Sequence, residues 1–465
     1  MASQPTTRLQ ASGHRFLIRR MEHALVRRNV AMHDDPLRAQ SLSLVASFVL
    51  AVITVAGCAI LAFARPQGAL GSAPIVMARE SGALYVRIDD TLHPVPNLAS
   101  ARLIARSAAT PVAVGEATIA SEKRGPSMGI PGAPAAIGAP LAAPSWMVCD
   151  SDRTVVIVGA EPSAIDRLDG SRSVLVTPRG EGPATTYLLY GGRRAEVDLR
   201  NPAVVRALRL EGVAPLPVSR ALLDTMPEVP AIAAPAISDM GAAGPPSLAR
   251  IPVGSVVRVV RAESTDYYAV LHDGVQRIGE VAADLIRFTY PGGLDDVPTV
   301  APSAIARTPT VHPLAVEHLP HRAREPVGAD GSAAVCAHWR PDQVNDRSSS
   351  VVLTGKPPLA GDRATSLAQA DGDGPNVDAV VLPAGRSVDA RATAIVGDDG
   401  STGPRYLVSD LGVVYGIHDA DVAAHLGLPG PPAPAPWPIL AALPRGPELS
   451  TEAASVVRDG LLTPS

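Results

Sequence analysis

The sequence has 465 residues, a length that predicts about three domains of roughly 150 residues each. Proline accounts for 46 residues and glycine for 40, whereas the three aromatic types together supply only 3%. This composition argues against one large compact enzyme core and favours small modules joined by proline- and glycine-rich connections. The formal net charge is −4, so no global basic field points to nucleic acid and no nucleic-acid partner is predicted.

One uncharged apolar segment, residues 42–64, predicts a transmembrane helix over residues 41–64. As a helix its 23 residues would reach about 34 Å, which is enough to cross a hydrocarbon core of about 30 Å. The alternative is a cleavable signal peptide, whose apolar region is normally about 7–15 residues long and lies nearer the N-terminus. Because about 40 residues precede the segment, we expect a retained single-pass anchor.

Arginines are distributed unevenly around this segment, and the asymmetry predicts its orientation. Only Arg65 and Arg79 follow it closely, whereas seven arginines precede it: Arg8, Arg15, Arg19, Arg20, Arg27, Arg28 and Arg38. The positive-inside rule then places the N-terminus in the cytoplasm and the remaining residues, about 400 of them, on the other side of the membrane.

The N-terminal arm, residues 1–40, is predicted to form a basic amphipathic helix with Ser12 as a candidate cap. Apolar residues recur at helical spacing through Leu17, Met21, Ala24 and Leu25. The other faces carry the arginines Arg15, Arg19, Arg20, Arg27 and Arg28. Two compatible roles follow, an interfacial helix on anionic membrane lipid and a docking helix for a cytoplasmic partner.

Four stretches after the anchor share one pattern, in which an aromatic residue heads a short strand, followed by a turn, a second short strand and an alanine-rich helix. They begin at Tyr85, Tyr187, Tyr268 and Tyr406. The predicted repeats span residues 71–124, 181–225, 250–290 and 401–430. A ββα unit of about 25 residues cannot bury a core alone, so the copies should pack together. The alternative is that any hairpin followed by a helix gives this pattern.

Turn and cap residues support these repeats. The second and third contain the predicted hairpin turns Gly191-Gly192 and Asp273-Gly274. The helices of the first, second and fourth have the predicted N-caps Asn97, Asn201 and Asp419.

Other β-type runs predict a central antiparallel sheet assembled from residues 145–180 and 330–400. Cys58 lies in the span, which leaves Cys149 and Cys336 as the two cysteines in an oxidising compartment. A disulfide would join the two halves of the sheet, and the alternative is two free buried thiols. Residues 125–144 and 290–335 are expected to be surface connections or mobile loops, and 431–465 a proline-rich C-terminal tail. The expected fold class is α+β.

Motifs for nucleotide and ester chemistry fail on their spacing. A P-loop needs a lysine followed by serine or threonine, but Lys356 precedes Pro357 and Lys123 lies in SEKRG. Residues 125–129 match the hydrolase pattern G-x-S-x-G, yet they lie in a glycine- and proline-rich linker with no preceding strand.

Metal motifs fail as well. The acidic run 371–374 has its glycine at the fourth position of a calcium loop rather than the sixth, and Leu382 stands where a bidentate glutamate is required. His312, His318 and His321 lie in a segment broken by prolines, which we expect to be flexible. The sequence therefore predicts no catalytic residue, cofactor or metal.

The order and spacing of several segments resemble the EccB family, the B-type membrane component of type VII (ESX) secretion systems of mycobacteria and related actinobacteria. The matching segments are SGHRFLIRRMEHALVRRNVAMHDDPLRAQ (12–40) before the span, MVCDSD (147–152), TTYLLYGGRRAEVDLRNPAVVRALRL (185–210), AADLIRF (282–288), YLVSDLGVVYGI (406–417) and APWPILAALPRGPELS (435–450).

This resemblance implies a single-pass protein of the cell inner membrane with an elongated periplasmic part, in which four repeats flank a β core. It implies that Cys149 and Cys336 are the family's disulfide pair and that the four tyrosines head its repeats. The implied partners are a C-type FtsK/SpoIIIE-like ATPase, a D-type multi-pass channel component, an E-type component and further copies of the chain.

Three functions are compared on this basis. The first is a structural subunit of the secretion core complex that organises its periplasmic face. The second is an ATP hydrolase without a P-loop, because the family is often labelled ATPase although the residue search gives that label no support. The third is a cell-wall binding module, suggested by the small β units.

Overall fold

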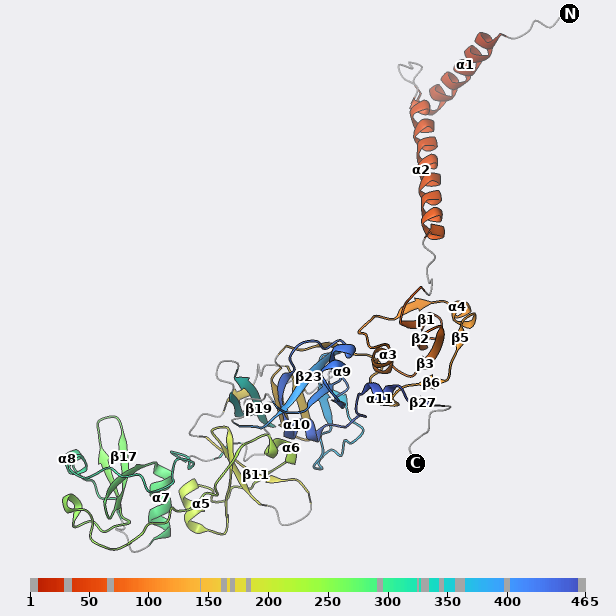
Figure 1. The fold of residues 1–465 in the computed structure, drawn as a ribbon. Coiled ribbons are helices and arrows are strands. Elements are labelled where there is room, and N and C mark those ends of the chain that lie inside the picture. Colours follow the sequence, from red (N-terminus) through yellow and green to blue (C-terminus); the bar gives the residue numbers. More distant parts are fainter. Residues whose placement is uncertain are drawn as a thin grey trace, which may run out of the picture. The chain divides into compact units, whose positions relative to one another are not determined.

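The computed structural model describes residues 7–28, 36–64, 71–142, 144–159, 165–167, 172–180, 185–290, 296–323, 326–327, 334–342, 347–355, 364–396 and 402–458. Two compact units make up the chain, Met1–Gly71 and Ser72–Ser465. The first contains two helices, and the second contains the strands and the shorter helices (Figure 1).

Helix α1 (Arg8–Arg27) begins after Thr7, whose backbone N–H donates to the side chain of Gln10 at 3.0 Å. The predicted cap, Ser12, lies inside the helix instead, and its hydroxyl donates to the carbonyl of Leu9 at 3.0 Å. The correction has a simple cause: the chain is already helical from Arg8, so Ser12 has no free helix end to cap.

Helix α2 (Pro36–Ala64) contains a segment, Leu42–Ile60, that is long and apolar enough to cross a membrane. Its large side chains are exposed, Leu44 by 72% and Phe48 by 71%, as expected for a helix whose partner is lipid. The predicted span therefore corresponds to one continuous helix (Figure 1).

Four parts of the second unit share one order of elements, β-β-β-α-β-α-β, and we call them modules 1 to 4. Module 1 contains β1 (Ile75–Ala78), β2 (Leu84–Ile88), β3 (Thr91–Val95), α3 (Leu98–Ala105), β4 (Val112–Val114), α4 (Glu116–Ala120) and β5 (Lys123–Arg124). Module 2 contains β11 (Val174–Pro178), β12 (Tyr187–Tyr190), β13 (Arg193–Glu196), α5 (Pro202–Leu208), β14 (Leu216–Val218), α6 (Arg220–Asp224) and β15 (Glu228–Val229).

Modules 3 and 4 have the same order, with single bridges in place of some strands. Module 3 contains β16 (Val256–Val260), β17 (Thr265–Leu271), β18 (Gly274–Ile278), α7 (Glu280–Thr289) and α8 (Pro302–Ala306), with parallel bridges Arg258–Thr299 and Val275–Thr310. Module 4 contains β23 (Arg386–Thr393), β24 (Arg405–Val408), β25 (Val414–Ile417), α9 (Ala420–Leu426), β26 (Ala433–Pro436) and α10 (Trp437–Ala442), with the bridge Val414–Arg445.

In each module the first three strands are antiparallel, and the two later strands add in parallel at the edges. The sheet order is β4-β1-β2-β3-β5 in module 1 and β14-β11-β12-β13-β15 in module 2. The ββα stretches expected from the sequence therefore form only the middle of a larger module. Each also has a strand before the tyrosine and a β-α-β part after the first helix.

The expected helix caps are confirmed. The side chains of Asn97, Asn201 and Asp419 accept backbone N–H groups in the first turns of α3, α5 and α9. The turn Gly191-Gly192 is also confirmed, with φ of +53° and +78° between paired residues of β12 and β13.

The other predicted turn is displaced by one residue. Leu271 pairs with Gly274, so the turn consists of His272 and Asp273 rather than Asp273 and Gly274. Gly274 is needed for another reason, because a Cβ there would lie 2.2 Å from the carbonyl oxygen of Pro309.

The central sheet contains β8 (Trp146–Asp150), β9 (Thr154–Val158), β10 (Ile165–Arg167), β19 (Ala334–Asp342), β20 (Arg347–Gly355), β21 (Thr365–Ser366) and β22 (Ala379–Val381). Its order is β10-β20-β19-β8-β9-β22-β21, and only β9 and β22 pair in parallel. Side chains alternate between two buried faces: Trp146 and Val148 belong to one core cluster, Met147 and Cys149 to another.

Short elements complete the second unit. They are β6 (Ser127–Met128), β7 (Ala139–Pro140), the 3₁₀ helix at Pro246–Leu248, α11 (Thr451–Ala454) and β27 (Val457–Arg458). β27 pairs with β6, and α11 packs beside α3. The segment expected as a C-terminal tail thus contains part of module 4 and a strand that returns to the residues after module 1.

Candidate functional site

The acidic and histidine motifs are used in local structure. Asp371 accepts the backbone and side-chain N–H groups of Asn376, and Asp378 accepts the backbone N–H groups of Asp371 and Gly372. In the segment expected to be flexible, the carbonyl oxygen of His321 accepts the N–H of Glu280 at 2.7 Å. Among the residues that the structure describes, no group of three or more histidine, cysteine, aspartate or glutamate side chains could hold a metal ion.

The G-x-S-x-G match also has a structural explanation. The hydroxyl of Ser127 donates to the carbonyl of Pro94 at 3.3 Å, and Ser127 belongs to the short strand β6. A Cβ on Gly125 would meet the ring of His93 at 2.2 Å, so the glycine permits this ring to pack. The motif therefore supports module 1. Lys356, one of the two lysines tested for a phosphate loop, lies outside the described residues.

The four tyrosines occupy one equivalent position in their modules. Each lies in the second strand and is paired with the first: Tyr85 with Val76, Tyr187 with Val176, Tyr268 with Val257 and Tyr406 with Ala390. Each tyrosine is also paired with a residue of the third strand. Two positions before that residue, the third strand pairs with the last strand of the module, at Leu92, Arg194, Val275 or Val414. The registers of the four modules therefore coincide.

In modules 3 and 4 the tyrosine ring lies on the sheet face that the second helix of the module covers. Tyr268 is buried together with Ala304 and Ile305 of α8. The ring of Tyr406 lies 5.9 Å from that of Trp437, the first residue of α10. We infer that the tyrosine anchors the second helix, a part of the module that its sequence motif does not include.

Replacing Tyr268 with alanine should destabilise module 3 by about 3 kcal/mol, because a large buried aromatic side chain is removed from between β17 and α8. Hydrogen exchange of the α8 and β17 amides measures the effect. The control Arg307→Ala alters an exposed side chain at the end of α8. Equal effects of the two substitutions would contradict an anchoring role for the tyrosine.

The second halves of the modules, which the predicted ββα pattern does not include, align without a gap. They are residues 112–124, 216–228, 298–310 and 433–445, and in each the second helix begins four residues after the segment starts. The eighth position is always isoleucine or leucine: Ile119, Leu223, Ile305 and Leu440. A search for this 13-residue spacing, beginning 27 to 30 residues after each tyrosine, would have found them.

Two further positions in this segment distinguish the modules that contact the central sheet. Modules 2 and 4 carry large apolar residues at the seventh and eleventh positions: Leu222 and Met226, and Ile439 and Leu443. All four are buried in one cluster with Trp146 and Val335 of the central sheet, and α6 lies against α10 (Figure 1). Modules 1 and 3 have Thr118 and Glu122, and Ala304 and Thr308, at the same positions.

The first helices join the modules in pairs. Helix α5 of module 2 packs against α7 of module 3, with Val204, Leu208 and Leu285 buried between them. Helix α3 of module 1 packs against α9 of module 4, where Arg102 donates to the carbonyl of Leu426 at 2.7 Å. In each module the first helix therefore contacts a neighbouring module, and in modules 2 and 4 the second helix contacts the central sheet.

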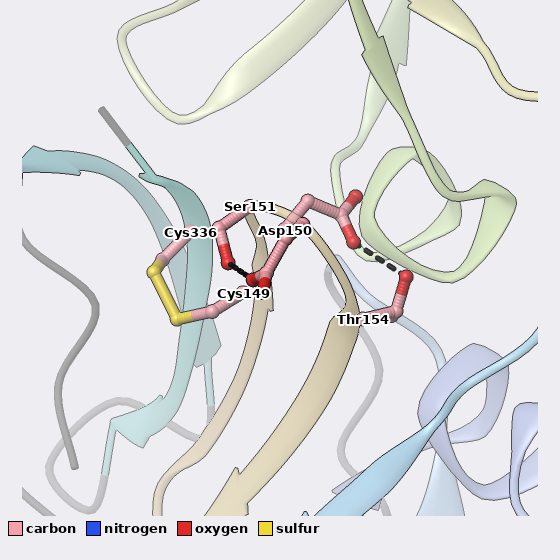
Figure 2. Close-up of a disulfide and its surroundings, with 6 residues drawn as sticks. Cys149, Asp150, Ser151, Thr154 and Cys336 are labelled. Carbon is pink, nitrogen blue, oxygen red and sulfur yellow. Dashed lines mark hydrogen bonds between the residues drawn. A yellow bond between two sulfur atoms is a disulfide. The ribbon is translucent and has the colours of Figure 1, made fainter. Parts of the chain in front are cut away.

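The predicted disulfide is present. Cys149 of β8 lies directly opposite Cys336 of β19, with 4.0 Å between their Cα atoms. Both cysteines are buried, and the bond joins the two parts of the chain that form the sheet. Figure 2 shows the disulfide on one side of β8 and the carboxylate of Asp150 on the other.

The basic arm corresponds to α1. The side chains of Arg15, Arg20 and Arg28 are exposed, as are the apolar side chains of Leu17, 55%, and Met21, 60%. The side chain of Arg27 lies outside the described residues. An exposed apolar stripe beside cations has the pattern of a helix that binds a surface.

The described residues define a modular α+β protein with one candidate membrane-spanning helix, whose modules pack on one another and on a central sheet. The chain belongs to the EccB family: residues 3–463 match the family model described as "Type VII secretion system ESX-1, transport TM domain B". It is similar to the ESX-3 secretion system ATPase EccB3 of Mycolicibacterium smegmatis, with 36% identity, 98% of this chain and 92% of that protein covered. It is also similar to the ESX-1 secretion system ATPase EccB1 of Mycobacterium tuberculosis, with 33% identity, 99% and 96% covered.

Two solved structures extend the likeness to the fold. A chain of an intact ESX-5 inner membrane complex covers 100% of this chain, and 98% of its own length is matched, with a TM-score of 0.73 and 31% identity. A chain of the EccB3 dimer from the ESX-3 core complex covers 83% of this chain, with 100% of its own length matched, a TM-score of 0.72 and 35% identity.

Proposed function

We propose that this protein is a structural subunit of the inner-membrane core complex of a type VII secretion system. The observation that carries the proposal is the family membership over nearly the whole chain, together with similar chains that were solved as a dimer and inside an inner membrane complex. The described residues add a physical reason. Their helices and buried apolar side chains form contacts between modules and with the central sheet, as a scaffold requires.

The orientation and the partners follow from this proposal. Helix α1 lies on the cytoplasmic side, as the excess of arginine before the span requires, and the four modules lie in the periplasm. The modules serve as repeats that flank the sheet and support self-association. The partners are a C-type FtsK/SpoIIIE-like ATPase, a D-type multi-pass channel component and an E-type component.

Affinity purification of the full chain from its native membrane in mild detergent tests the proposal. Native sizing and mass spectrometry should find the chain at megadalton size with an FtsK-like ATPase and a multi-pass partner. A lone monomer or a small homo-oligomer would overturn it.

ATP hydrolysis is the second candidate function, since the similar proteins carry the name ATPase. A hydrolase predicts turnover by the purified chain alone. If ATP turnover follows the FtsK-like partner when the complex is dissociated, the activity belongs to that partner.

Helix α1 should bind anionic lipid, and each arginine near the surface contributes roughly 1 kcal/mol. The triple variant Arg15→Glu, Arg19→Glu and Arg20→Glu should weaken binding by at least tenfold. A fluorophore at Leu17→Cys in a Cys58→Ala chain, placed in phosphatidylglycerol nanodiscs, reports contact through quenching by brominated lipid. Equal quenching with and without the arginines would favour a protein partner for α1 instead.

A further inference from the structure

Module 2 meets the central sheet through two kinds of contact. The apolar contact places α6, with Leu222 and Met226, against the sheet. Such burial is favourable but non-directional, so it does not define one orientation by itself. The main polar contact lies at the end of β8 and consists of Asp150, Thr154, Arg179 and Ser219. All four are buried, with at most 8% of each residue exposed. We call this cluster the module 2 lock. A separate hydrogen bond runs from the hydroxyl of Ser350 on β20 to the carbonyl of Thr225 at 3.3 Å.

Asp150 is the centre of the lock because both of its carboxylate oxygens are used. Oδ1 accepts the hydroxyl of Thr154 at 2.7 Å, as Figure 2 shows, and Oδ2 accepts the backbone N–H of Ser219 at 2.6 Å. Ser219 is the N-cap of α6, and its own hydroxyl oxygen accepts the N–H of Leu222. The sheet is thereby bonded to the start of the helix that carries the apolar contact.

Arg179 provides a second connection from module 2, just after β11. Its guanidinium donates to the hydroxyl oxygen of Thr154 at 3.1 Å and to the carbonyl of Ser151 at 2.8 Å. It also lies 3.8 Å from the carboxylate of Asp150. Burial raises the pKa of Asp150, whereas its hydrogen bonds and Arg179 lower it. The carboxylate therefore depends on these partners, and breaking the lock leaves a buried polar group without compensation.

A close backbone approach marks the other side of the same contact. Gly192, in the hairpin turn of module 2, has φ of +78°, and a Cβ there would lie 1.9 Å from the carbonyl oxygen of Ser350 on β20. The neighbouring Gly191 also has a positive φ, +53°, but a Cβ there would meet no atom within 4 Å. Only Gly192 therefore combines turn geometry with contact to the sheet.

We propose that the module 2 lock fixes the orientation of modules 2 and 3 on the disulfide-bonded sheet, with Asp150 as the positioning residue. Directional hydrogen bonds from the β8–β9 turn reach two separate points of module 2, and two fixed points restrict rotation where an apolar surface does not. Module 3 follows module 2 because α5 and α7 pack together. In an assembly of several copies, this orientation decides which faces of modules 2 and 3 reach a neighbour.

Pulsed dipolar electron paramagnetic resonance on the full chain in detergent, with Cys58→Ala, tests the proposal. Spin labels at Glu263→Cys in module 3 and Leu411→Cys in module 4 measure the distance between these two modules, and both sites are exposed. Asp150→Asn should broaden the distance distribution. It should also speed exchange of the α6 amides about tenfold, while the α5 and α7 amides stay protected. An unchanged distribution would overturn the proposal.

Two controls separate orientation from stability. Asp389→Asn removes another buried carboxylate, which binds Arg405 within module 4, and it should leave the distance distribution narrow. If Asp150→Asn also speeds exchange of the α7 amides, the two glycine substitutions decide whether the lock sets the orientation or only the stability of modules 2 and 3. Gly192→Ala should broaden the distribution and Gly191→Ala should not, although both strain the turn. Equal effects of the two glycine substitutions would also overturn the proposal.

Discussion

A chain with Cys149→Ala and Cys336→Ala should lose roughly 2–5 kcal/mol of stability, because the disulfide closes a loop between residues 187 positions apart. The loss should be confined to the central sheet and to the contacts that modules 2 and 4 make with it. Modules 2 and 3 lie inside the loop and pack on each other through α5 and α7, so they should keep their own protection from exchange.

Denaturation and hydrogen exchange of the full chain in detergent measure this difference. The β8 and β19 amides should exchange faster in the double variant, whereas the α5 and α7 amides should not. Cys58→Ala is the matched control, because that cysteine is free and exposed on α2. A midpoint identical to the wild type would show that the ladder between β8 and β19 holds the sheet without the covalent bond.

In the 13-residue second half of module 2, replacing the residues at the seventh and eleventh positions with those of module 1 should release module 2 from the sheet. Leu222→Thr with Met226→Glu gives module 2 the residues that module 1 has there. The change empties apolar volume and buries a carboxylate, so a loss of at least about 4 kcal/mol is expected. Limited proteolysis should then cut the connections on either side of modules 2 and 3.

One control keeps an apolar residue in module 2, and the other makes the reciprocal exchange in module 1. Met226→Leu preserves apolar volume and should cost less than about 1.5 kcal/mol. The reciprocal change in module 1, Thr118→Leu with Glu122→Met, should not affect the sheet, because that helix does not belong to the core cluster around Trp146. If the module 2 exchange leaves proteolysis unchanged, the apolar positions do not decide docking.

The helix caps and the glycine turn were predictable because each depends on a few neighbouring residues. Asn97, Asn201 and Asp419 accept first-turn N–H groups from residues two or three positions away. Gly191 and Gly192 form a two-residue turn whose positive φ favours glycine. Ser12 was wrong as a cap for the same local reason, since Thr7 precedes it at the true helix start.

The module boundaries were harder to predict because their signals are split along the chain. The β-α-β part after the first helix contains no aromatic residue apart from Trp437, and in modules 2, 3 and 4 it carries prolines, so it resembles a loop. The strand before the tyrosine in module 2, β11, lies within residues 145–180 and was assigned to the central sheet instead. The edge strands are short and pair in parallel with strands up to 43 residues earlier, as Pro436 does with Thr393 or Val218 with Pro178. Such pairings leave no local turn signal.

The membrane-spanning candidate helix, the family and the four tyrosine positions were predictable because each is carried by contiguous residues, and the cysteine pair was expected because only two cysteines lie outside the span. That modules 2 and 4 hold the sheet, and that Asp150 bonds module 2 to the strand carrying Cys149, is visible only in the folded chain. The physical reason is sequence separation. Asp150 meets Ser219, 69 residues later, and Thr154 meets Asp378, 224 residues later, and no local pattern encodes partners that far apart.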